Sequence, residues 1–580
     1  MSQFTKSKIA IILGMGVLAA PAYVNAAPQP DAGAILDTVR EKDLPQPKKA
    51  SPGIDVQRED VPVKQRAGGA KVTPKSFKIT GSTAFSESEL QALVAPWVGK
   101  EQSLSDLERA AAEISRHYRD RGYFVARAYL PAQDISAGVV QIAILEGHIG
   151  KVKVNVSGDG WLDEQVVQSL VSASAGEGTI VQDSQLERGL LLSNDLSGVK
   201  VSSTLVPGAT VGTSDLVVDA EQTGAVDGNV DIDTFGNRFT GQIRVGGTLN
   251  VNSPLKMGDQ LSARVMTTGS GMHYGRLSYT LPVGTAGTKV GGAYSAMRYT
   301  LGREFSALNA TGDAQVASLY ALHRFVRSRN FNLYGTVGYD QKKMQNDVGG
   351  ITTSVIGDDI FSVGISGDSR DSLIGGGGMN SFSASYASGR VDLSGWPANQ
   401  VFDAAGPQTA GSYNKFNYNI ARMQRVDDGL ALFASLTGQI ASRNLESSSR
   451  FSLGGANGVR AYPQGEGSGD QGYLLNVEVR KDMGDAGYGN MQMVGFVDMG
   501  HIQLYKSSWA GWQGTNPALQ GAYNLAGAGI GLNLDVAENY SFRSYLAAKI
   551  GSNGGRDVLG NDSDGTSSSV RAWLQLVKWF

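Results

Sequence analysis

The chain has 580 residues, no cysteine, 76 glycines and a formal net charge of −3 at pH 7. The absence of cysteine excludes thiol catalysis, disulfide scaffolds and zinc–cysteine sites, and the near-neutral charge gives no basic field for binding nucleic acid. Glycine makes up about 13% of the chain, against roughly 7% in average proteins. With 21 Tyr and 18 Phe, this composition favours many closely packed strands over helices.

The first 26 residues have the pattern of a secretory signal peptide. Lys6 and Lys8 precede an apolar run over residues 9–20, and the small-residue pattern at residues 24–26 predicts cleavage after Ala26. The alternative, an N-terminal membrane anchor, requires a longer run. No later uncharged apolar run approaches the roughly 20 residues of a spanning helix. The sequence therefore predicts an exported protein that is either soluble or a membrane β-barrel, and excludes a helical membrane protein.

Residues 27–43 contain one predicted helix, and residues 44–74 form a predicted linker. Over residues 31–43 three apolar residues, Ile35, Leu36 and Val39, share one helix face. The linker is rich in Pro, Lys, Gly and Asp without periodicity. A lone helix on such a tether cannot bury its apolar face, so it is either a docking element or a disordered tail, and the sequence by itself favours the tail.

Two small α+β modules follow, at residues 75–146 and 147–222. The first has the order β-α-α-β-β, with a capped helix after Ser86, a second helix over residues 105–119 and a strand over residues 123–130. The second module repeats this order. A tandem repeat of this kind is more informative than any single motif.

The segment 223–580 is predicted to be a membrane β-barrel. Its strands alternate apolar and polar residues; in residues 472–480, for example, Tyr473, Leu475, Val477 and Val479 alternate with Asn476, Glu478 and Arg480. A β-sandwich also shows such alternation. The barrel is favoured because the segment is too long for one sandwich and because its polar face carries full charges, which a water-filled lumen tolerates. The residues that illustrate this are Glu478, Arg480, Arg543 and Lys549. About ten residues per strand predicts an even number near 16, and the last strand ends on an aromatic residue, Phe580.

The most informative segment is the Gly-rich loop at residues 452–472, which carries Val459-Arg460-Ala461-Tyr462. Arg460 is either incidental in an extracellular loop or has a buried anionic partner. The candidate partner is Asp498, because Phe496, Asp498 and Gly500 share one face of a strand. A pair shielded by the barrel wall would be charge-assisted and bidentate.

Motifs for catalysis, cofactors and metals are not found. Residues 467–472 match GxGxxG but lead into a strand instead of opening a helix, so they indicate loop flexibility. There is no Walker A motif, and the five histidines show no metal-binding spacing. The sequence predicts no enzyme activity, no cofactor and no metal.

The chain resembles the transporters of two-partner secretion, the TpsB group of the BamA-like outer-membrane superfamily, in its haemolysin-activator and haem-utilisation branch. The resemblance is carried by GGANGVRAYPQGEGSGDQGY, which matches the family's VRG(F/Y) loop, by GFVDMG, which matches its F-x-D-x-G strand, and by residues 367–383. It implies POTRA-like modules, a barrel, and a loop arginine, Arg460, that pairs with Asp498 inside the lumen. There are two departures: Ala461 replaces the family's glycine, and Lys578 replaces an aromatic residue common there.

The resemblance also implies the function. The POTRA-like modules would bind a secreted TpsA-type exoprotein (an adhesin, haemolysin or haem-acquisition protein) in the periplasm of a Gram-negative bacterium by adding a strand to a sheet edge. The exoprotein would cross the outer membrane unfolded and without ATP, while the helix at residues 27–43 would plug the resting pore. Lipid and the barrel-assembly machinery would be further partners, the latter through Phe580. The alternatives are an insertase of the same superfamily, a nutrient porin or receptor, and an outer-membrane enzyme.

Overall fold

The computed structural model describes residues 29–39, 71–158, 160–487, 489–514, 516–536 and 539–580, and only the backbone of residues 54–56. The expected signal peptide, residues 1–26, lies outside the described residues. The same holds for residues 40–43 of the expected helix and for most of the expected linker.

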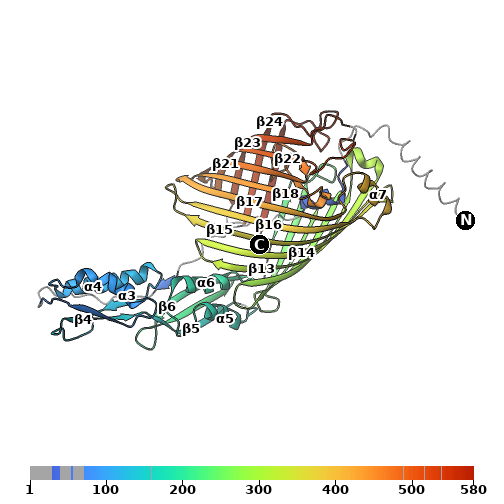
Figure 1. The fold of residues 1–580 in the computed structure, drawn as a ribbon. Helices are drawn as coiled ribbons and strands as arrows, with labels where there is room; N and C mark the ends of the chain where they lie inside the picture. The colour runs from blue at the N-terminus through green and yellow to red at the C-terminus, as the bar shows by residue number, and fades with distance from the viewer. Residues whose placement is uncertain are drawn as a thin grey trace.

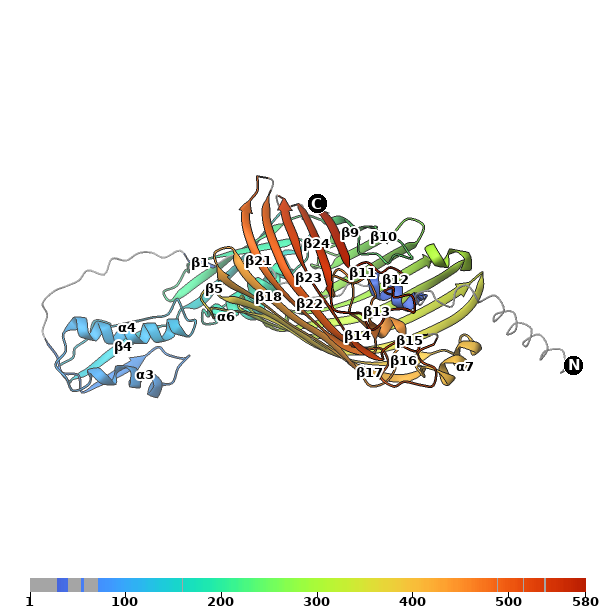
Figure 2. The ribbon, with the colours of Figure 1, turned by 90° about the horizontal axis from the view of Figure 1, so that it is seen from above.

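Two small α+β modules extend from one end of a long barrel, and the short helix α7 (Pro397–Ala405) lies at the other end (Figures 1 and 2). Connections between barrel strands at the module end are short, whereas the long connections, such as residues 442–470 and 551–569, lie at the α7 end. This asymmetry is typical of outer-membrane barrels, in which short turns face the periplasm and long loops face outward.

The first module packs two helices against a three-stranded sheet of order β2-β4-β3, with β2 parallel and β3 antiparallel to β4. Its elements are β2 (Ser76–Thr80), α3 (Glu87–Val94), η1 (Ala95–Trp97), α4 (Leu104–Asp120), β3 (Arg127–Tyr129) and β4 (Val139–Leu145). The strand predicted over residues 123–130 is wrong in its length. Tyr123 instead packs edge-on against Phe85 and Tyr118, and this aromatic contact holds the chain away from the sheet.

The second module repeats the same element order and the same pairing. Its elements are β5 (His148–Ser157), α5 (Glu164–Ser174), α6 (Asp183–Asn194), β6 (Val199–Pro207) and β7 (Thr213–Gln222). Strand β1 (Ile54–Val56) adds to this sheet, in parallel with β6. The prediction of a linker without regular structure is therefore wrong at residues 54–56, because an exposed sheet edge accepts any extended backbone.

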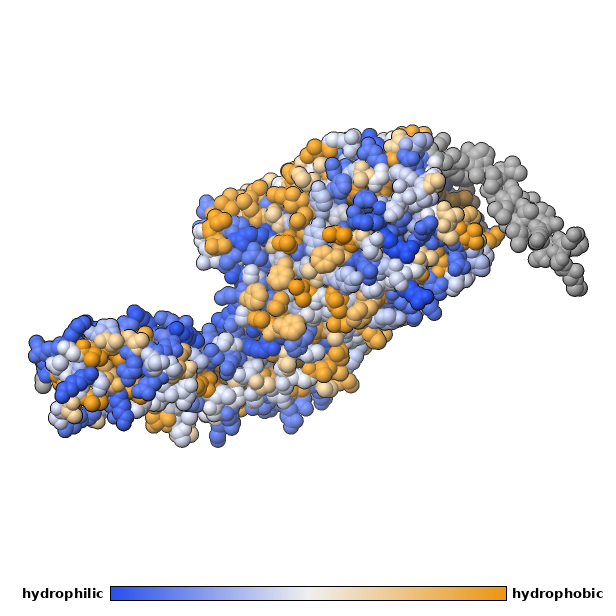
Figure 3. Space-filling model, in the orientation of Figure 1, coloured by the Kyte–Doolittle hydropathy of each residue, from blue (hydrophilic) through white to orange (hydrophobic). Residues whose placement is uncertain are grey.

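Sixteen antiparallel strands close the barrel, which confirms the predicted fold class. Their bounds are β8 (Val226–Asp233), β9 (Arg244–Asn252), β10 (Gln260–Thr267), β11 (Met272–Val283), β12 (Thr288–Thr300), β13 (Ala310–Arg327), β14 (Phe331–Val348), β15 (Ile351–Asp371), β16 (Gly378–Asp392), β17 (Gly411–Asp427), β18 (Leu430–Ala441), β21 (Gln471–Asp485), β22 (Asn490–Gln503), β23 (Ala522–Val536), β24 (Tyr540–Ile550) and β25 (Val570–Trp579). Outward-facing side chains such as Leu319, Ile365 and Ile530 are more than half exposed. Figure 3 shows such apolar side chains gathered on the barrel wall. None of the helices among the described residues is long and apolar enough to span a membrane.

The barrel closes where β25 pairs with β8. Beyond this pairing, Phe580 and Gly228 exchange two backbone hydrogen bonds of 3.1 Å. A side chain at position 228 would meet the Phe580 ring at 2.9 Å, so glycine is needed there. Lys578, the departure noted near the C-terminus, lies over the Tyr540 ring at 5.2 Å, a cation–π contact that suits a lysine at a membrane interface.

The second module is attached to the barrel by buried ion pairs. Asp195, at the end of α6, accepts hydrogen bonds from Nε of Arg327 at 2.8 Å and from Nη2 at 3.1 Å. Arg324 approaches the same carboxylate at 3.0 Å. A carboxylate held by two arginines away from solvent fixes the angle of this module, because losing either partner leaves a buried charge unpaired.

Candidate pore site: loop 442–470 and helix α2 in the lumen

The connection between β18 and β21, residues 442–470, folds into the barrel instead of extending outward. It contains η3 (Ser447–Ser449) and the two short strands β19 (Phe451–Ser452) and β20 (Ser468–Gly469), which pair with each other. The four residues singled out in the sequence lie in its most enclosed part: Val459, Ala461 and Tyr462 are 0% exposed and Arg460 is 4% exposed. The loop therefore carries its own small core, formed with the inner faces of β21 to β24.

Arg460 is paired with Asp498. Nη2 of Arg460 lies 2.6 Å from Oδ1 of Asp498, and Nε donates to Oδ2 at 2.9 Å. The backbone N–H of Arg460 also donates to Oδ2, at 3.0 Å. Asp498 is fully buried, so its carboxylate fixes both the side chain and the backbone of the loop arginine.

Three further groups hold Arg460, two at its guanidinium and one at its backbone carbonyl. Nη1 donates to Oε1 of Glu478 at 2.7 Å, and the guanidinium carbon lies 3.5 Å from the centroid of the Phe496 ring. The indole N–H of Trp573 donates to the carbonyl oxygen of Arg460 at 2.7 Å. One cation is thus held by two carboxylates and an aromatic face, a geometry that the planar guanidinium satisfies and an ammonium does not.

The register of β21 and β22 explains this arrangement. Asn476 is directly opposite Asp498, and Glu478 is directly opposite Phe496. Because side chains alternate along a strand, all four point to the lumen. Asn476 donates to Oδ1 of Asp498 at 2.7 Å and to the carbonyl oxygen of Gly458 at 3.1 Å, so the strand wall also holds the loop two residues before Arg460.

Two glycines leave room for the loop. A side chain at Gly500 would meet Leu453 of the loop at 2.6 Å, and one at Gly527 would meet the Cβ of Ala461 at 2.5 Å. Ala461 does not have a positive φ, so the family's glycine is not required there for conformational reasons. The methyl group of Ala461 occupies space that Gly527 leaves open.

Helix α2 (Ala32–Val39) lies inside the barrel, nearer the α7 end, where Figures 1 and 2 both show it in blue. Ala32, Ile35, Leu36 and Val39 are at most 5% exposed and pack on the inner wall. For these residues the prediction of a disordered tail is wrong. The sequence could not show it, because the apolar partners come from strands more than 200 residues away.

Helix α2 also touches loop 442–470. A side chain at Gly33 would lie 2.2 Å from Oγ of Ser447 and 2.7 Å from the backbone nitrogen of Ser448. This contact lets the helix approach η3 with backbone against backbone, as only glycine permits. At the start of the helix Asp31 accepts a hydrogen bond from the N–H of Ala34 at 2.8 Å, which caps the helix.

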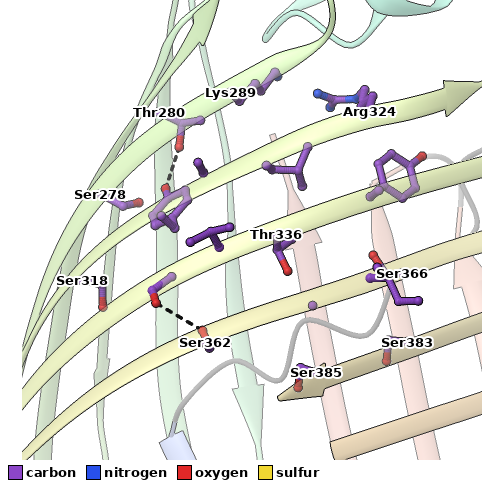
Figure 4. A pocket seen from close by; sticks show the side chains of 18 of the residues that line it. Ser278, Thr280, Lys289, Ser318, Arg324, Thr336, Ser362, Ser366, Ser383 and Ser385 are labelled. Carbon is purple, nitrogen blue, oxygen red and sulfur yellow. Dashed lines mark hydrogen bonds between the residues drawn. The ribbon is translucent and has the colours of Figure 1, made fainter. Parts of the chain in front are cut away.

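A cavity of about 920 Å³ lies along the lumen wall formed by β9 to β16. Figure 4 shows hydroxyl side chains from successive strands pointing into it, among them Ser278, Thr280, Ser318, Thr336, Ser362, Ser366, Ser383 and Ser385. The charged side chains in its lining are Arg264, Arg276, Lys289, Arg324, Arg327, Arg329 and Arg370, with Asp340 and Asp368. Such a wall offers hydrogen bonds to an extended chain at many points.

Several of these features could not be predicted from the sequence. Glu478 was expected in the lumen but not as a partner of Arg460, and the roles of Gly527 and Gly33 depend on neighbours distant in sequence. The only available signal was the alternation that places Glu478 on the polar face. Among the described residues no cluster of three or more His, Asp or Glu side chains is arranged to hold a metal ion.

Comparison with known proteins identifies the family. The sequence model of the haemolysin secretion/activation proteins ShlB, FhaC and HecB matches residues 212–534, and that of the ShlB-type POTRA domain matches residues 72–147. The first match covers more than half of the chain, so the chain belongs to the ShlB/FhaC/HecB family of haemolysin secretion/activation proteins.

Curated relatives and solved structures agree with this assignment. The heme/hemopexin transporter protein HuxB of Haemophilus influenzae strain Rd is 26% identical over 577 residues, 96% of each chain. The outer membrane transporter CdiB of Dickeya dadantii is 25% identical over 468 residues, 78% of this chain and 81% of CdiB. The structure of CdiB from Escherichia coli superimposes with a TM-score of 0.71 at 21% identity, over 90% of this chain and 92% of that one. CdiB from Acinetobacter baumannii gives 0.63 at 17% identity, over 91% and 95%.

The chain is thus an outer-membrane transporter of two-partner secretion in a Gram-negative bacterium. Its POTRA domains lie in the periplasm and its barrel crosses the outer membrane. Its relatives are transporters and not enzymes, and they point to a secreted exoprotein of the TpsA type as its partner.

Proposed function

We propose that the exoprotein crosses the outer membrane unfolded through the barrel lumen, without ATP, and that α2 and loop 442–470 close this lumen at rest. The proposal rests on the position of both segments, which occupy the lumen but are not part of its wall. Helix α2 is attached to the wall by apolar packing and few polar contacts, and the loop is held around Arg460. Both can leave while the 16-stranded wall stays closed.

The source of energy follows from the compartment and the sequence. The periplasm lacks ATP, and the chain has no Walker A motif. Transport is then driven by folding of the exoprotein outside the cell, which discourages its return. The cavity wall suits such passage, because its hydroxyl groups can form hydrogen bonds with an extended chain at many points. No nucleophile or carboxylate constellation for catalysis was found in the sequence, so we propose that the chain is not an enzyme.

Recognition of the exoprotein is assigned to the first module. In the described part of the chain, β3 is at the edge of its sheet with no strand on its outer side, whereas β1 covers the corresponding edge of the second module. Strand addition to β3 beside α4 gives backbone hydrogen bonds, and the neighbouring surface gives selectivity. Tyr129 of β3 is exposed there.

The barrel has two further partners, membrane lipid and the barrel-assembly machinery. The outward-facing band, which includes Phe361, Ile365 and Leu546, contacts lipid. Phe580 is 59% exposed at the end of β25 and is the signal for the barrel-assembly machinery.

Reconstituted vesicles test the proposal. Purified transporter is inserted into liposomes that lack nucleotide, and an unfolded TpsA-type exoprotein that it secretes in cells is added from urea with a fluorescent label. Protection of the labelled chain from external protease is expected to rise with time and to need no ATP. A requirement for ATP, or no uptake by a transporter that secretes in cells, contradicts the proposal.

A further inference from the structure

The wall patch under α2 has an unusual composition. It contains four of the chain's 13 methionines, from strands β10, β11, β12 and β14. We define the α2 seat as Met266, Met272, Met297, Met344, Tyr299 and Phe305, which are all at most 4% exposed with α2 in place. Methionine is unbranched, flexible and polarisable, so it fits side chains of different shapes where Leu or Ile fits one. A seat built only for a fixed helix does not need this adaptability.

Two polar side chains of the wall, Asn346 and Arg244, bond to backbone groups of α2. Oδ1 of Asn346 accepts a hydrogen bond from the N–H of Ala32 at 2.8 Å, near the start of the helix. Nη1 of Arg244 donates to the carbonyl oxygen of Thr38 at 3.1 Å, near its end. Every polypeptide offers these two groups, so the contacts select for a peptide backbone and not for the sequence of α2.

The seat is continuous with the transport path. Tyr274 lines the large cavity and also packs in the cluster that holds α2. Arg264 lines the cavity two residues before Met266 on the same strand. A chain that moves along the cavity wall toward the α7 end therefore reaches the seat. Once α2 has left, this apolar patch faces water inside the lumen, which is unfavourable until apolar side chains cover it again.

We propose that the α2 seat is a binding site for apolar stretches of the polypeptide in transit, and that α2 occupies it at rest in their place. The inference rests on the proposed function, because it assumes that the exoprotein passes through the lumen. The ligand class is an unfolded segment with several aliphatic side chains, recognised through them and through its backbone. Release of α2 and entry of the exoprotein then compete for one surface.

Peptide binding tests the inference on the otherwise complete transporter lacking residues 31–39, purified in detergent. Three fluorescent peptides serve as probes: the sequence of α2, a nonapeptide alternating Leu and Ser, and the same nonapeptide with every Leu replaced by Ser. The first two are expected to bind and to displace each other, and the third is not. Binding of the α2 peptide alone overturns the inference.

Two double variants locate the binding. M297S/M344S is expected to weaken both apolar peptides by about tenfold, because the apolar surface is lost. M297L/M344L conserves volume and is expected to keep the α2 peptide but weaken the Leu–Ser peptide. M493S/M499S, at two exposed methionines of β22, is the matched control, and barrel closure of each variant is checked by its shift on heating in gels. Unchanged binding of the Leu–Ser peptide to a folded M297S/M344S barrel contradicts the inference. If the intact transporter secretes normally in that case, only the inference fails and the proposed function stands.

Discussion

Arg460 and Asp498 form a two-point ion pair that joins the pore loop to the barrel wall, with distances of 2.6 and 2.9 Å. Neither side chain is more than 5% exposed. Removing the buried cation leaves Asp498 without a cationic partner, whereas Glu478 keeps Arg480 at 2.7 Å; breaking a buried pair typically costs about 3–5 kcal/mol. The pair therefore contributes to the free energy needed to move the loop, and breaking it leaves the backbone hydrogen bonds between the wall strands intact.

Replacing Arg460 by alanine is expected to abolish secretion while the barrel still assembles. The loop loses its attachment to Asp498, whereas the hydrogen bonds between the strands are unaffected. Secretion of the exoprotein and the heat-shifted mobility of the barrel are measured on the same cells. Arg460→Lys keeps the charge but cannot make the four side-chain contacts, so it is expected to restore only a small part of secretion. Normal secretion by the alanine variant contradicts the role of the pair.

The contact between Gly527 and Ala461 predicts a reciprocal rescue. Gly527→Ala places a methyl group 2.5 Å from the Cβ of Ala461 and is expected to displace the loop and reduce secretion. Adding Ala461→Gly removes the clash, so the double variant is expected to recover. Protease sensitivity of the loop reports its position in the two single variants and in the double variant. Independent effects of the two substitutions would show that this contact does not position the loop.

Removing α2 is expected to open the pore. Deleting residues 31–43 uncovers the lumen, so single-channel conductance in planar bilayers should increase. Gly33→Val is a milder change that forces α2 away from Ser447 and Ser448 and should produce frequent openings. Ala34→Ser, on a half-buried position of the same helix, is the control and should stay closed. Unchanged conductance after the deletion is incompatible with a plug.

Glu146 predicts a pH dependence of the first module. Its buried carboxylate accepts hydrogen bonds from the N–H groups of Thr83 and Ala84 at 2.7 and 2.9 Å and from the Tyr118 hydroxyl at 2.7 Å. Burial alone would raise the pKa of Glu146, but these hydrogen bonds outweigh it and hold the pKa below its usual value. The carboxylate therefore stabilises the module at neutral pH, and this contribution is lost as the pH falls below the unfolded value of about 4.3.

Glu146→Gln should then lower the free energy of opening of this module by about 1–3 kcal/mol at pH 7. Hydrogen exchange of β4 in the full chain measures the difference. It should shrink toward pH 3, where the wild-type carboxyl also becomes neutral. An equal difference at both pH values contradicts the assignment.

The barrel, the two modules and the Arg460–Asp498 contact could be anticipated because each depends on local periodicity or on a short motif. Alternation along a strand places Phe496, Asp498 and Gly500 on one face whatever the rest of the chain does. The seating of α2 could not be predicted, because its partners lie on strands that meet only when the barrel closes. The pairing of β1 with β6 was missed for a related reason: three residues carry too little pattern to show a strand, and the open edge that accepts them lies far away in sequence.

If the exoprotein passes through the space that α2 occupies, a reversible lock on α2 must stop its secretion. The chain has no cysteine, so Ala32→Cys with Asn346→Cys places the only two thiols in the protein on neighbouring groups, since the backbone nitrogen of Ala32 lies 2.8 Å from Oδ1 of Asn346. Secretion is measured with the bridge oxidised and after reduction, beside both single-cysteine variants. We predict that secretion stops when the bridge forms and resumes on reduction. Undiminished secretion with the bridge intact would contradict transport through this lumen.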